Sequence, residues 1–346
     1  MRPPQQKPVI ARRFTSALPV DLAHATVASR SDITCESGTR LTIGMSGSPS
    51  PAHHRCGFAA IVGRPNVGKS TLLNALLGTK ISIVAPKPQT TRHRILGILT
   101  RPGSQIVFVD TPGIHSQARR VMNKYMNRSA LSSLDDADVL LFVVEALAWT
   151  DDDERVLERV CKSQRPAIAI INKVDRVHDK PLLLPYMDGL AKRAEFAALL
   201  PLSAEKRDKL EKLPDLIASL LPESPALFPT DQVTDRSERF LASEIVREKL
   251  TWRLREELPY GLTVEIETFE RADNRLNIGA VIWVERTGQK AIVIGAGGER
   301  LKEIGRLARL ELNQLLKASV HLELWVKVKE NWSDSEQALK SFGYES

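Results

Sequence analysis

The stretch Gly63-Arg64-Pro65-Asn66-Val67-Gly68-Lys69-Ser70 decides the fold of the first large part of the chain. It matches the pattern GxxxxGK[ST] and lies between an apolar run at 58–62 and an amphipathic run at 69–77. A strand, a glycine-rich loop and a helix in this order place backbone N–H groups and a helix N-terminus around a phosphate. The sequence therefore predicts a phosphate-binding loop in which Lys69 neutralises phosphate charge and the Ser70 hydroxyl ligates Mg²⁺.

Short apolar runs alternate with amphipathic runs on both sides of this loop. The predicted strands are Phe58–Val62, Ile95–Leu99, Gln105–Val109, Asp138–Val144, Pro166–Ile171 and Leu199–Leu202. The predicted helices are Lys69–Leu77, Arg119–Leu134, Asp151–Cys161, Leu183–Phe196 and Asp208–Leu221. Near-continuous apolar strands separated by helices are typical of a parallel sheet covered on both faces. We expect an α/β P-loop domain with a mostly parallel sheet.

Three further motifs follow the loop in the order that a GTPase requires. Asp110-Thr111-Pro112-Gly113 ends a predicted strand, so the Asp110 carboxylate can reach Mg²⁺ and the Gly113 amide the γ-phosphate. Asn172-Lys173-Val174-Asp175 ends another strand, and Ser203-Ala204-Glu205 follows the last one. The carboxylate of Asp175 can accept hydrogen bonds from N1–H and the 2-amino group of guanine, which adenine does not offer. The motifs predict selection of GTP over ATP.

The segment Pro88-Gln89-Thr90-Thr91-Arg92 is expected to supply a second contact to Mg²⁺ and the γ-phosphate. We prefer Thr91 because it directly precedes Arg92, with Thr90 as the alternative. Ile114 stands where Ras-like GTPases carry a glutamine that orients water, which indicates slow hydrolysis or water held by backbone and metal. Asn66 either makes an ordinary loop turn or helps to coordinate a monovalent cation.

The last third of the chain has a different pattern. Pro222, Pro225 and Pro229 mark a stiff linker. Beyond it we predict a helix over 238–257, strands over 262–270 and 276–285, a helix over 299–317 and a strand over 320–329. A separate apolar segment, Gln289–Ile294, precedes the glycine cluster Gly295-Ala296-Gly297-Gly298. The pattern predicts an α+β domain.

The glycine cluster fits the GxxG loop of an RNA-binding module, where a backbone without side chains lets a sugar–phosphate strand approach closely. Residues 234–346 carry 18 Lys and Arg against 19 Asp and Glu, so the RNA site must be a local patch. The RNA-site candidates are Lys290, Gly295, Ala296, Gly297, Gly298, Arg300, Lys302 and Arg306. The loop has no basic residue at Ala296-Gly297, so either binding is weaker or Arg300 and Lys302 compensate.

Composition excludes several classes of protein. The chain has 346 residues with 49 Lys and Arg against 42 Asp and Glu, and no apolar run approaches the ~18–20 residues of a membrane span. Its three cysteines, Cys35, Cys56 and Cys161, form neither a disulfide framework nor a zinc pattern.

The first 44 residues have three interpretations: a disordered tail, a basic targeting peptide, or an extension upstream of a true start at Met45. We favour the third.

With the run 89–94 beside these motifs, the sequence resembles the Era family of bacterial ribosome-assembly GTPases. The C-terminal stretches Glu257–Tyr260, Val281–Arg286, Gly288–Lys290, Val293–Gly295 and His321–Lys329 resemble the type II KH domain of that family. The resemblance spans about residues 57–344. It implies slow, Mg²⁺-dependent GTP hydrolysis, binding of the 16S rRNA 3′ end, assembly of the 30S subunit and control of RNA binding by the GTP state. It also implies a cytoplasmic monomer, with peripheral association at the inner membrane and potassium-stimulated hydrolysis through Asn66 as further expectations.

The predicted organisation is an extension over 1–55, a G domain over 56–222, a linker over 223–233, a KH domain over 234–330 and a tail over 331–346. The residues expected to bind nucleotide are Gly63, Arg64, Pro65, Asn66, Val67, Gly68, Lys69, Ser70, Thr71, Asp110, Thr111, Pro112, Gly113, Ile114, Asn172, Lys173, Val174, Asp175, Ser203 and Ala204. The predicted metal ligands are Ser70, Thr91 and Asp110, and the predicted catalytic residues are Lys69, Thr91 and Gly113.

The alternative function is an RNA chaperone in which nucleotide only stabilises the fold. A single GxxxxGKS excludes a tandem G-domain protein, and the second domain argues against a metabolic kinase.

Overall fold

The computed structural model describes residues 54–87, 90–113, 121–254, 261–272 and 275–344. The chain divides into Met1–Ser48, which lies outside these residues, and Pro49–Ser346, which contains all of them. The predictions for the first 44 residues, for Gln89, for Ile114 and for Tyr260 fall outside the described part, as does Arg119, where one helix was predicted to begin. The boundaries between the five predicted parts of the chain stay a prediction.

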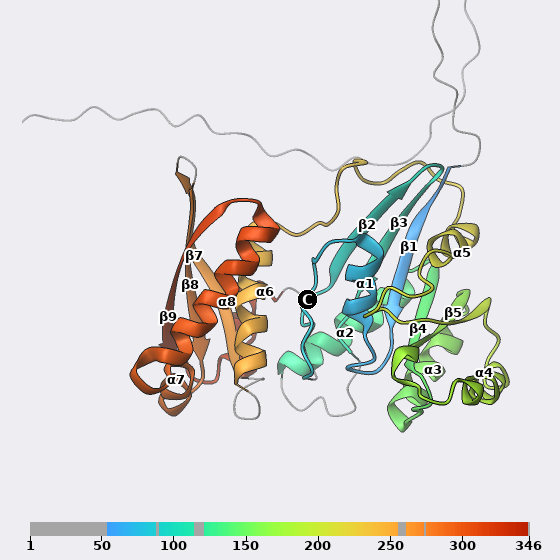
Figure 1. The fold of residues 1–346 in the computed structure, drawn as a ribbon, viewed down its shortest axis with the longest axis horizontal. Helices are drawn as coiled ribbons and strands as arrows, with labels where there is room; N and C mark the ends of the chain where they lie inside the picture. Colours follow the sequence, from blue (N-terminus) through green and yellow to red (C-terminus); the bar gives the residue numbers. More distant parts are fainter. Residues whose placement is uncertain (1–53, 88–89, 114–120, 255–260, 273–274, 345–346) are drawn as a thin grey trace, which may run out of the picture. The chain divides into compact units, whose positions relative to one another are not determined.

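A six-stranded sheet forms the core of the first half of the described chain (Figure 1). Its strands are β1 (Arg55–Val62), β2 (Ile95–Arg101), β3 (Ser104–Asp110), β4 (Val139–Glu145), β5 (Ala167–Asn172) and β6 (Ala198–Pro201). They lie in the order β2-β3-β1-β4-β5-β6, and all pairs are parallel except the β2–β3 hairpin. The predicted α/β fold with a mostly parallel sheet is confirmed.

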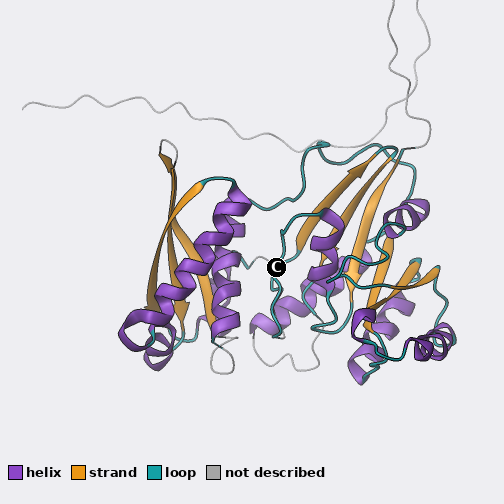
Figure 2. Cartoon of the chain, viewed as in Figure 1, coloured by secondary structure: helices purple, strands orange, loops and turns teal. Residues whose placement is uncertain are grey.

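Helices cover both faces of this sheet, as Figure 2 shows. They are α1 (Lys69–Leu77), α2 (Val121–Asp135), α3 (Asp151–Ser163), α4 (Leu183–Ala191) and α5 (Leu213–Leu220), with short 3₁₀ turns η1 (Val174–Arg176) and η2 (Lys180–Leu182). Alternate residues of β1 enter separate cores: Ala59 and Ile61 pack with α1 and α5, and Ala60 and Val62 pack with α2, α3 and α4. Burial on two faces explains why these strands read as continuous apolar runs.

Two predicted helices are shorter than expected. The helix predicted over 183–196 ends at Ala191, and the one predicted over 208–221 begins only at Leu213. Asp208 exchanges two backbone hydrogen bonds with Ser203, of 3.0 and 3.2 Å, which keeps the chain in a loop there. Pro214 then stands in the first turn of α5, where a missing N–H costs nothing.

The segment between α5 and the next helix is fixed to the first sheet. The side chain of Gln105, fully buried, accepts from the N–H groups of Leu227 and Phe228 and donates to the Phe228 carbonyl. Further along, the N–H of Ile98 donates to the carbonyl of Val233 at 2.8 Å. The linker is therefore tied to β2 and β3 along much of its length.

The second sheet has three strands and belongs to an α+β domain. Its elements are α6 (Glu238–Arg253), β7 (Leu262–Ala272), β8 (Arg275–Val284), α7 (Thr287–Ile294), η3 (Ala296–Gly298), α8 (Glu299–Leu316) and β9 (Ser319–Val328). β8 pairs antiparallel with β7 and parallel with β9. In Figure 1, α6 and α8 lie side by side over one sheet face, and their apolar residues share one core with the strands. The predicted α+β pattern is confirmed.

The C-terminal residues, expected as a tail, contain two short helical elements. These are η4 (Trp332–Asp334) and α9 (Glu336–Ser341). The Trp332 side chain is fully buried in a cluster with Met122 and Met126 of α2. Tyr344 stacks on the buried ring of His93 with 4.4 Å between ring centroids, and burial lowers the pKa of His93 to about 4. This segment thus packs against residues far from it in sequence.

Candidate functional site

The phosphate-binding loop joins β1 to α1. Gly68 caps α1 with φ of 101°, a backbone conformation that side chains disfavour. A Cβ at this position would lie 2.3 Å from the side-chain nitrogen of Asn172. Glycine here therefore allows both the left-handed turn and the close approach of a second motif to the loop.

Lys69 is buried inside the loop that it follows. Its Nζ donates to the carbonyl oxygens of Gly63 and Arg64, both at 2.9 Å. Burial lowers the pKa of Lys69 to about 8, although the charge of Asp110 opposes part of this shift. The ammonium group is thus held in place before any phosphate arrives.

Three predicted metal ligands meet at one corner of the site. The Ser70 hydroxyl donates to Oδ2 of Asp110 at 2.8 Å and lies 2.8 Å from the Thr91 hydroxyl. Ser82, which the sequence did not single out, also donates to Oδ2 of Asp110 at 2.7 Å. The other carboxylate oxygen of Asp110 is buried and has no hydrogen-bond partner among the described residues. Burial raises the pKa of Asp110, against the effect of these hydroxyls.

This oxygen-rich corner fits Mg²⁺. Magnesium prefers oxygen ligands, and one carboxylate with hydroxyl groups and substrate phosphates is a common set for it. A cation would satisfy the unpaired oxygen of Asp110 and favour the ionised carboxylate. The three hydroxyl and carboxylate groups come from α1, from the segment before β2, and from the end of β3.

The structure separates the two candidate threonines. The hydroxyl of Thr91 lies at the metal corner, whereas that of Thr90 donates to the carbonyl of Lys87 at 2.6 Å. Pro88 and Gln89 of the same predicted segment lie outside the described residues. Thr91 is therefore the threonine whose position suits a metal ligand.

The two motifs expected at guanine are joined through Asn172. Its side chain donates to the carbonyl of Val67 at 2.8 Å and accepts from the N–H of Ala204 at 3.0 Å. The Ser203 hydroxyl donates to the exposed carboxylate of Asp175 at 2.5 Å. These contacts link the phosphate-binding loop to both base-binding motifs and leave Asp175 at the surface where a base could reach it.

Acidic side chains outside the motifs fix two predicted site residues. Glu145 pairs with Lys173 at 2.9 Å and with Arg64 at 3.1 Å, and Arg64 also pairs with the buried Asp153 at 2.9 Å. Burial alone would raise the pKa of Glu145, but the two cations hold it below its usual value. Sequence analysis missed Glu145, and its place at the end of β4, next to β5, is the only signal that could have found it.

Part of the predicted nucleotide-binding set lines one cavity of about 510 Å³. Its lining includes Pro65, Asn66, Gly68, Lys69, Ser70, Thr71, Thr91, Gly113, Asn172 and Lys173. Thr111 donates to the carbonyl of Ile61 at 3.0 Å, and Asn66, with φ of 64°, donates to the carbonyl of Pro86 at 3.3 Å. Val67 and Val174 are buried below the surface.

The GxxG loop lies between α7 and α8. Gly295 has φ of 75°, and a Cβ there would lie 2.7 Å from Cβ of Arg300. The Arg300 guanidinium donates to the carbonyl of Ile292 at 2.6 Å, so this cation spans the turn. Lys302 and Arg306 are exposed on the first turns of α8, and Lys290 of α7 is half-buried. Exposed cations beside a helix N-terminus are suited to phosphate contacts.

The described helices include none with the length and apolar composition needed to cross a bilayer. Cys56 and Cys161 carry free thiols, as expected, and Cys35 lies outside the described residues. Peripheral membrane association stays a prediction.

Two family models match the chain. The model for a 50S ribosome-binding GTPase matches residues 58–173, and the model for the KH domain matches residues 257–333. The matches cover the phosphate-binding loop and the GxxG loop, respectively.

Individual relatives match most of the chain. GTPase Era of Stenotrophomonas maltophilia (strain K279a) is 54% identical over 292 residues, which are 84% of this chain and 98% of that protein. GTPase Era of Marinobacter nauticus is 53% identical over 85% of this chain and 97% of that protein.

Two solved structures match the fold. A crystal structure of Era in complex with MgGDPNP and nucleotides 1506–1542 of 16S ribosomal RNA has a TM-score of 0.82 at 43% identity, covering 85% of this chain and all of that one. A variant of Aquifex aeolicus Era bound to GDP and AlF₄⁻ has a TM-score of 0.81 at 43% identity, over 84% of this chain and all of that one.

Proposed function

Because the chain belongs to the Era family of GTPases, we propose that it acts as a Mg²⁺-dependent GTP switch on 16S ribosomal RNA. In this proposal the KH domain binds the 3′ end of that RNA, and the protein assists assembly of the 30S subunit. The Era complex with MgGDPNP and a 16S rRNA fragment supports the choice of both ligands.

The arrangement of oxygen atoms at the metal corner is the main support for the proposed binding of GTP and Mg²⁺. Oxygen atoms of Ser70, Thr91 and Asp110 meet beside the buried Lys69, and one oxygen of Asp110 is left without a protein partner. Segments distant in sequence bring hard oxygen ligands together there, and such a set suits Mg²⁺. A bound triphosphate would bring the anionic oxygens that complete such a site.

The protein groups would act mainly by position and charge. Lys69 and the loop N–H groups would stabilise charge on the phosphates, and bound Mg²⁺ would neutralise the charge that develops on the leaving group. Ser70, Thr91 and Asp110 would hold the metal. The Gly113 amide would contact the γ-phosphate, and Asp175 would select guanine over adenine.

The RNA half of the proposal depends on the GxxG loop and the cations next to it. The loop lets a phosphate strand approach the N-terminus of α8, where Arg300, Lys302 and Arg306 lie. We propose that Arg300 and Lys302 supply the charge that the loop residues Ala296 and Gly297 lack. The RNA affinity should then fall steeply with salt.

A binding comparison tests the proposed function. Affinities for GTP, GDP and ATP are measured with and without a short RNA that matches the 16S 3′ end. We expect GTP to bind more tightly than ATP by about 10–100-fold, because guanine can donate hydrogen bonds to the charged carboxylate of Asp175 and adenine cannot. We also expect the affinity for RNA to differ between the states bound to a GTP analogue and to GDP. Equal uptake of ATP and GTP would contradict the nucleotide assignment.

Potassium dependence forms a separate part of the proposal. Asn66 lines the cavity and its side chain donates to the carbonyl of Pro86, so its amide would lie close to phosphates bound by the loop. A monovalent cation held there would add positive charge at the transition state. Hydrolysis rates measured at equal ionic strength in K⁺ and in Na⁺ test the potassium dependence. Equal rates in the two salts would contradict a role of Asn66 in binding K⁺.

A further inference from the structure

Helix α6 belongs to the three-stranded domain but contacts the segment that carries Thr91. We propose that Glu248, Trp252 and Arg247 of α6 are positioning residues for GTP hydrolysis. They hold the backbone at Val84 and at Thr90, so that the hydroxyl of Thr91 lies at the metal corner. This inference rests on the proposed GTPase function and adds residues of the RNA-binding domain to the hydrolytic site.

One residue of the segment is held on both of its backbone groups. The N–H of Val84 donates to Oε1 of Glu248 at 2.9 Å, and the indole Nε1 of Trp252 donates to the carbonyl of Val84 at 2.9 Å. Glu248 and Trp252 are four residues apart and therefore share one face of α6. The two bonds fix both the position and the orientation of this peptide relative to the helix.

A second contact holds the residue next to Thr91. The guanidinium of Arg247 donates to the carbonyl of Thr90 at 2.5 Å. Arg247 is itself fixed by Glu244, through bonds of 2.7 Å from Nε and 2.5 Å from Nη2. Because both side chains are buried, the guanidinium has little freedom to leave the carbonyl. The backbone of the threonine segment is thus held near each end.

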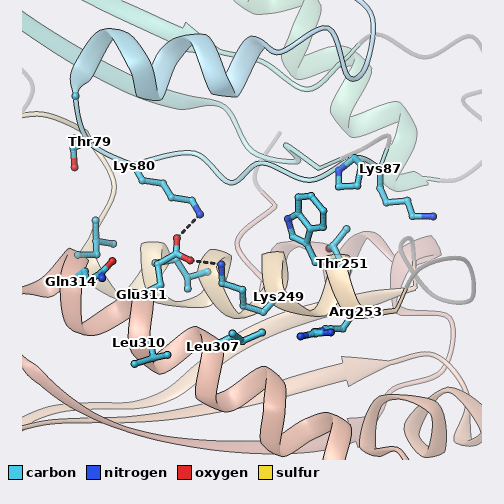
Figure 3. A pocket seen from close by; sticks show the side chains of 15 residues that line it. Thr79, Lys80, Lys87, Lys249, Thr251, Arg253, Leu307, Leu310, Glu311 and Gln314 are labelled. Carbon is cyan, nitrogen blue, oxygen red and sulfur yellow. Dashed lines mark hydrogen bonds and ion pairs between the residues drawn. The ribbon is translucent and has the colours of Figure 1, made fainter. Parts of the chain in front are cut away.

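Helix α8 stabilises the same arrangement. Lys80, just after α1, pairs with Glu248 at 2.7 Å and also with Glu311 of α8, and Lys249 pairs with the same two carboxylates. Figure 3 shows Lys80 and Lys249 pointing toward Glu311 from opposite sides of a cavity of about 1160 Å³. Since α8 begins at the GxxG loop, one rigid helix connects the proposed RNA contact with these positioning residues.

The position of Trp252 adds a direct link to the nucleotide. Its side chain is 52% exposed, yet it lines the 510 Å³ cavity together with Lys69, Ser70 and Thr91. In the proposed function Thr91 contacts the γ-phosphate and its Mg²⁺, and GDP lacks that phosphate. The positioning residues should therefore affect GTP and its metal more than GDP.

The first test uses a pair of matched tryptophan variants. Trp252→Phe keeps an aromatic ring but removes the N–H that holds Val84. Trp325→Phe makes the same change on strand β9, at a residue that is 44% exposed. We expect Trp252→Phe to lower kcat and raise the Mg²⁺ concentration for half-maximal hydrolysis by about threefold to tenfold, the worth of one hydrogen bond. The affinity for GDP should stay within about twofold of the wild-type value. Trp325→Phe should match the wild type in all three measurements.

The second test separates the hydrogen bond of Glu248 from its charge. Glu248→Gln keeps an oxygen that accepts from the N–H of Val84, whereas Glu248→Ala removes it. We expect Glu248→Ala to lose kcat by about threefold to tenfold and Glu248→Gln to recover most of it. Equal losses in the two variants would overturn the role assigned to the bond with Val84.

The outcomes distinguish this inference from the proposed function. If the wild-type protein hydrolyses no GTP, the proposed function fails. If the wild type is an active GTPase and Trp252→Phe behaves like Trp325→Phe, the positioning role is wrong while the function stands. An equal loss of GTP and GDP affinity in Trp252→Phe would also overturn it, because that result indicates a general structural effect.

Discussion

The nucleotide site and the GxxG loop place their polar groups in opposite environments. At the nucleotide site, Lys69, Asp110 and Asn172 are buried and are bonded to protein atoms. Beside the GxxG loop, Lys302 and Arg306 are exposed to water. Bonds to protein atoms hold the polar groups of the first site in place, which favours selectivity and chemistry. The second site attracts a polyanion through charges that salt can screen, so its affinity for RNA should depend on the salt concentration.

The largest effect should come from a buried ion pair next to the nucleotide segment. Glu244→Gln leaves the buried Arg247 without its charged partner and should cost about 3–5 kcal/mol in the free energy of unfolding. Glu303→Gln, in an exposed pair with Arg253 beside the GxxG loop, should cost at most about 1 kcal/mol. Urea unfolding of both variants measures the difference, and similar costs would contradict the contrast.

The same pair predicts a pH dependence. Burial alone would raise the pKa of Glu244, but the charge of Arg247 lowers it below its ordinary value of 4.5. The folded state therefore binds this proton less readily than the unfolded state, and the stabilisation is present above about pH 4.5. It should be lost as the pH falls from there toward the folded pKa, and Glu244→Gln should show a smaller loss over that range.

The next effect concerns catalysis without RNA binding. Lys69→Ala removes the buried cation and should lower kcat by about 10²–10³-fold, or about 2.7–4 kcal/mol, as for the loss of one preorganised donor. Its basal affinity for RNA in the absence of nucleotide should not change, because Lys69 is far in sequence and structure from the GxxG loop. A protein that only chaperones RNA would keep its cellular function in this variant, whereas a switch would lose it. Single-turnover hydrolysis and complementation are the two measurements.

Two glycine substitutions sharpen the comparison further. Gly68 and Gly297 both have positive φ, but a Cβ at Gly68 would clash with Asn172 while a Cβ at Gly297 meets no atom within 4 Å. Gly297→Ala should cost about 1–2 kcal/mol of stability from backbone strain alone. Gly68→Ala should cost about 1–3 kcal/mol more, since the neighbouring motif must shift. Thermal unfolding of the two variants gives the difference directly.

The smallest effect should be at the exposed cations. Lys302→Ala should weaken RNA binding across sequences alike and reduce the slope of log affinity against log salt by about 1. The GTP hydrolysis rate without RNA should stay at the wild-type value. An unchanged salt slope would show that Lys302 makes no phosphate contact.

The sequence predicted the parts of the molecule whose physics is local. The phosphate-binding loop, the strand runs and the GxxG loop each depend on residues that are adjacent in the chain, so their spacing alone indicates the structure. The end of α4 was predicted too late. The start of α5 was predicted too early, because the backbone pairing of Asp208 with Ser203 decides where this helix can begin. Apolar periodicity carries no information about that pairing.

Contacts between distant segments could not be predicted in the same way. Ser82 meets Asp110 across 28 positions, and Trp252 meets Val84 across 168. No sequence pattern around a single serine or an exposed tryptophan predicts which distant residue it will contact. The helical turns after residue 331 were missed for a related reason, because Trp332 is buried in a cluster that includes Met122 and Met126 of α2.

The fixed linker limits how the two domains could move. Gln105 holds the chain at residues 227–228, and bonds at Val233 and at the Asp235 side chain continue to anchor it to β2. The guanidinium of Arg236 also donates to the carbonyl of Arg94, so while these bonds persist a hinge between the domains would be confined to Ser237, just before α6 begins at Glu238. A reorientation of the two domains would then rotate α6 about its N-terminus. The largest displacement would occur at the C-terminal end of the helix, where Trp252 lies. Small rotations at the hinge would be enough to separate that tryptophan from Val84.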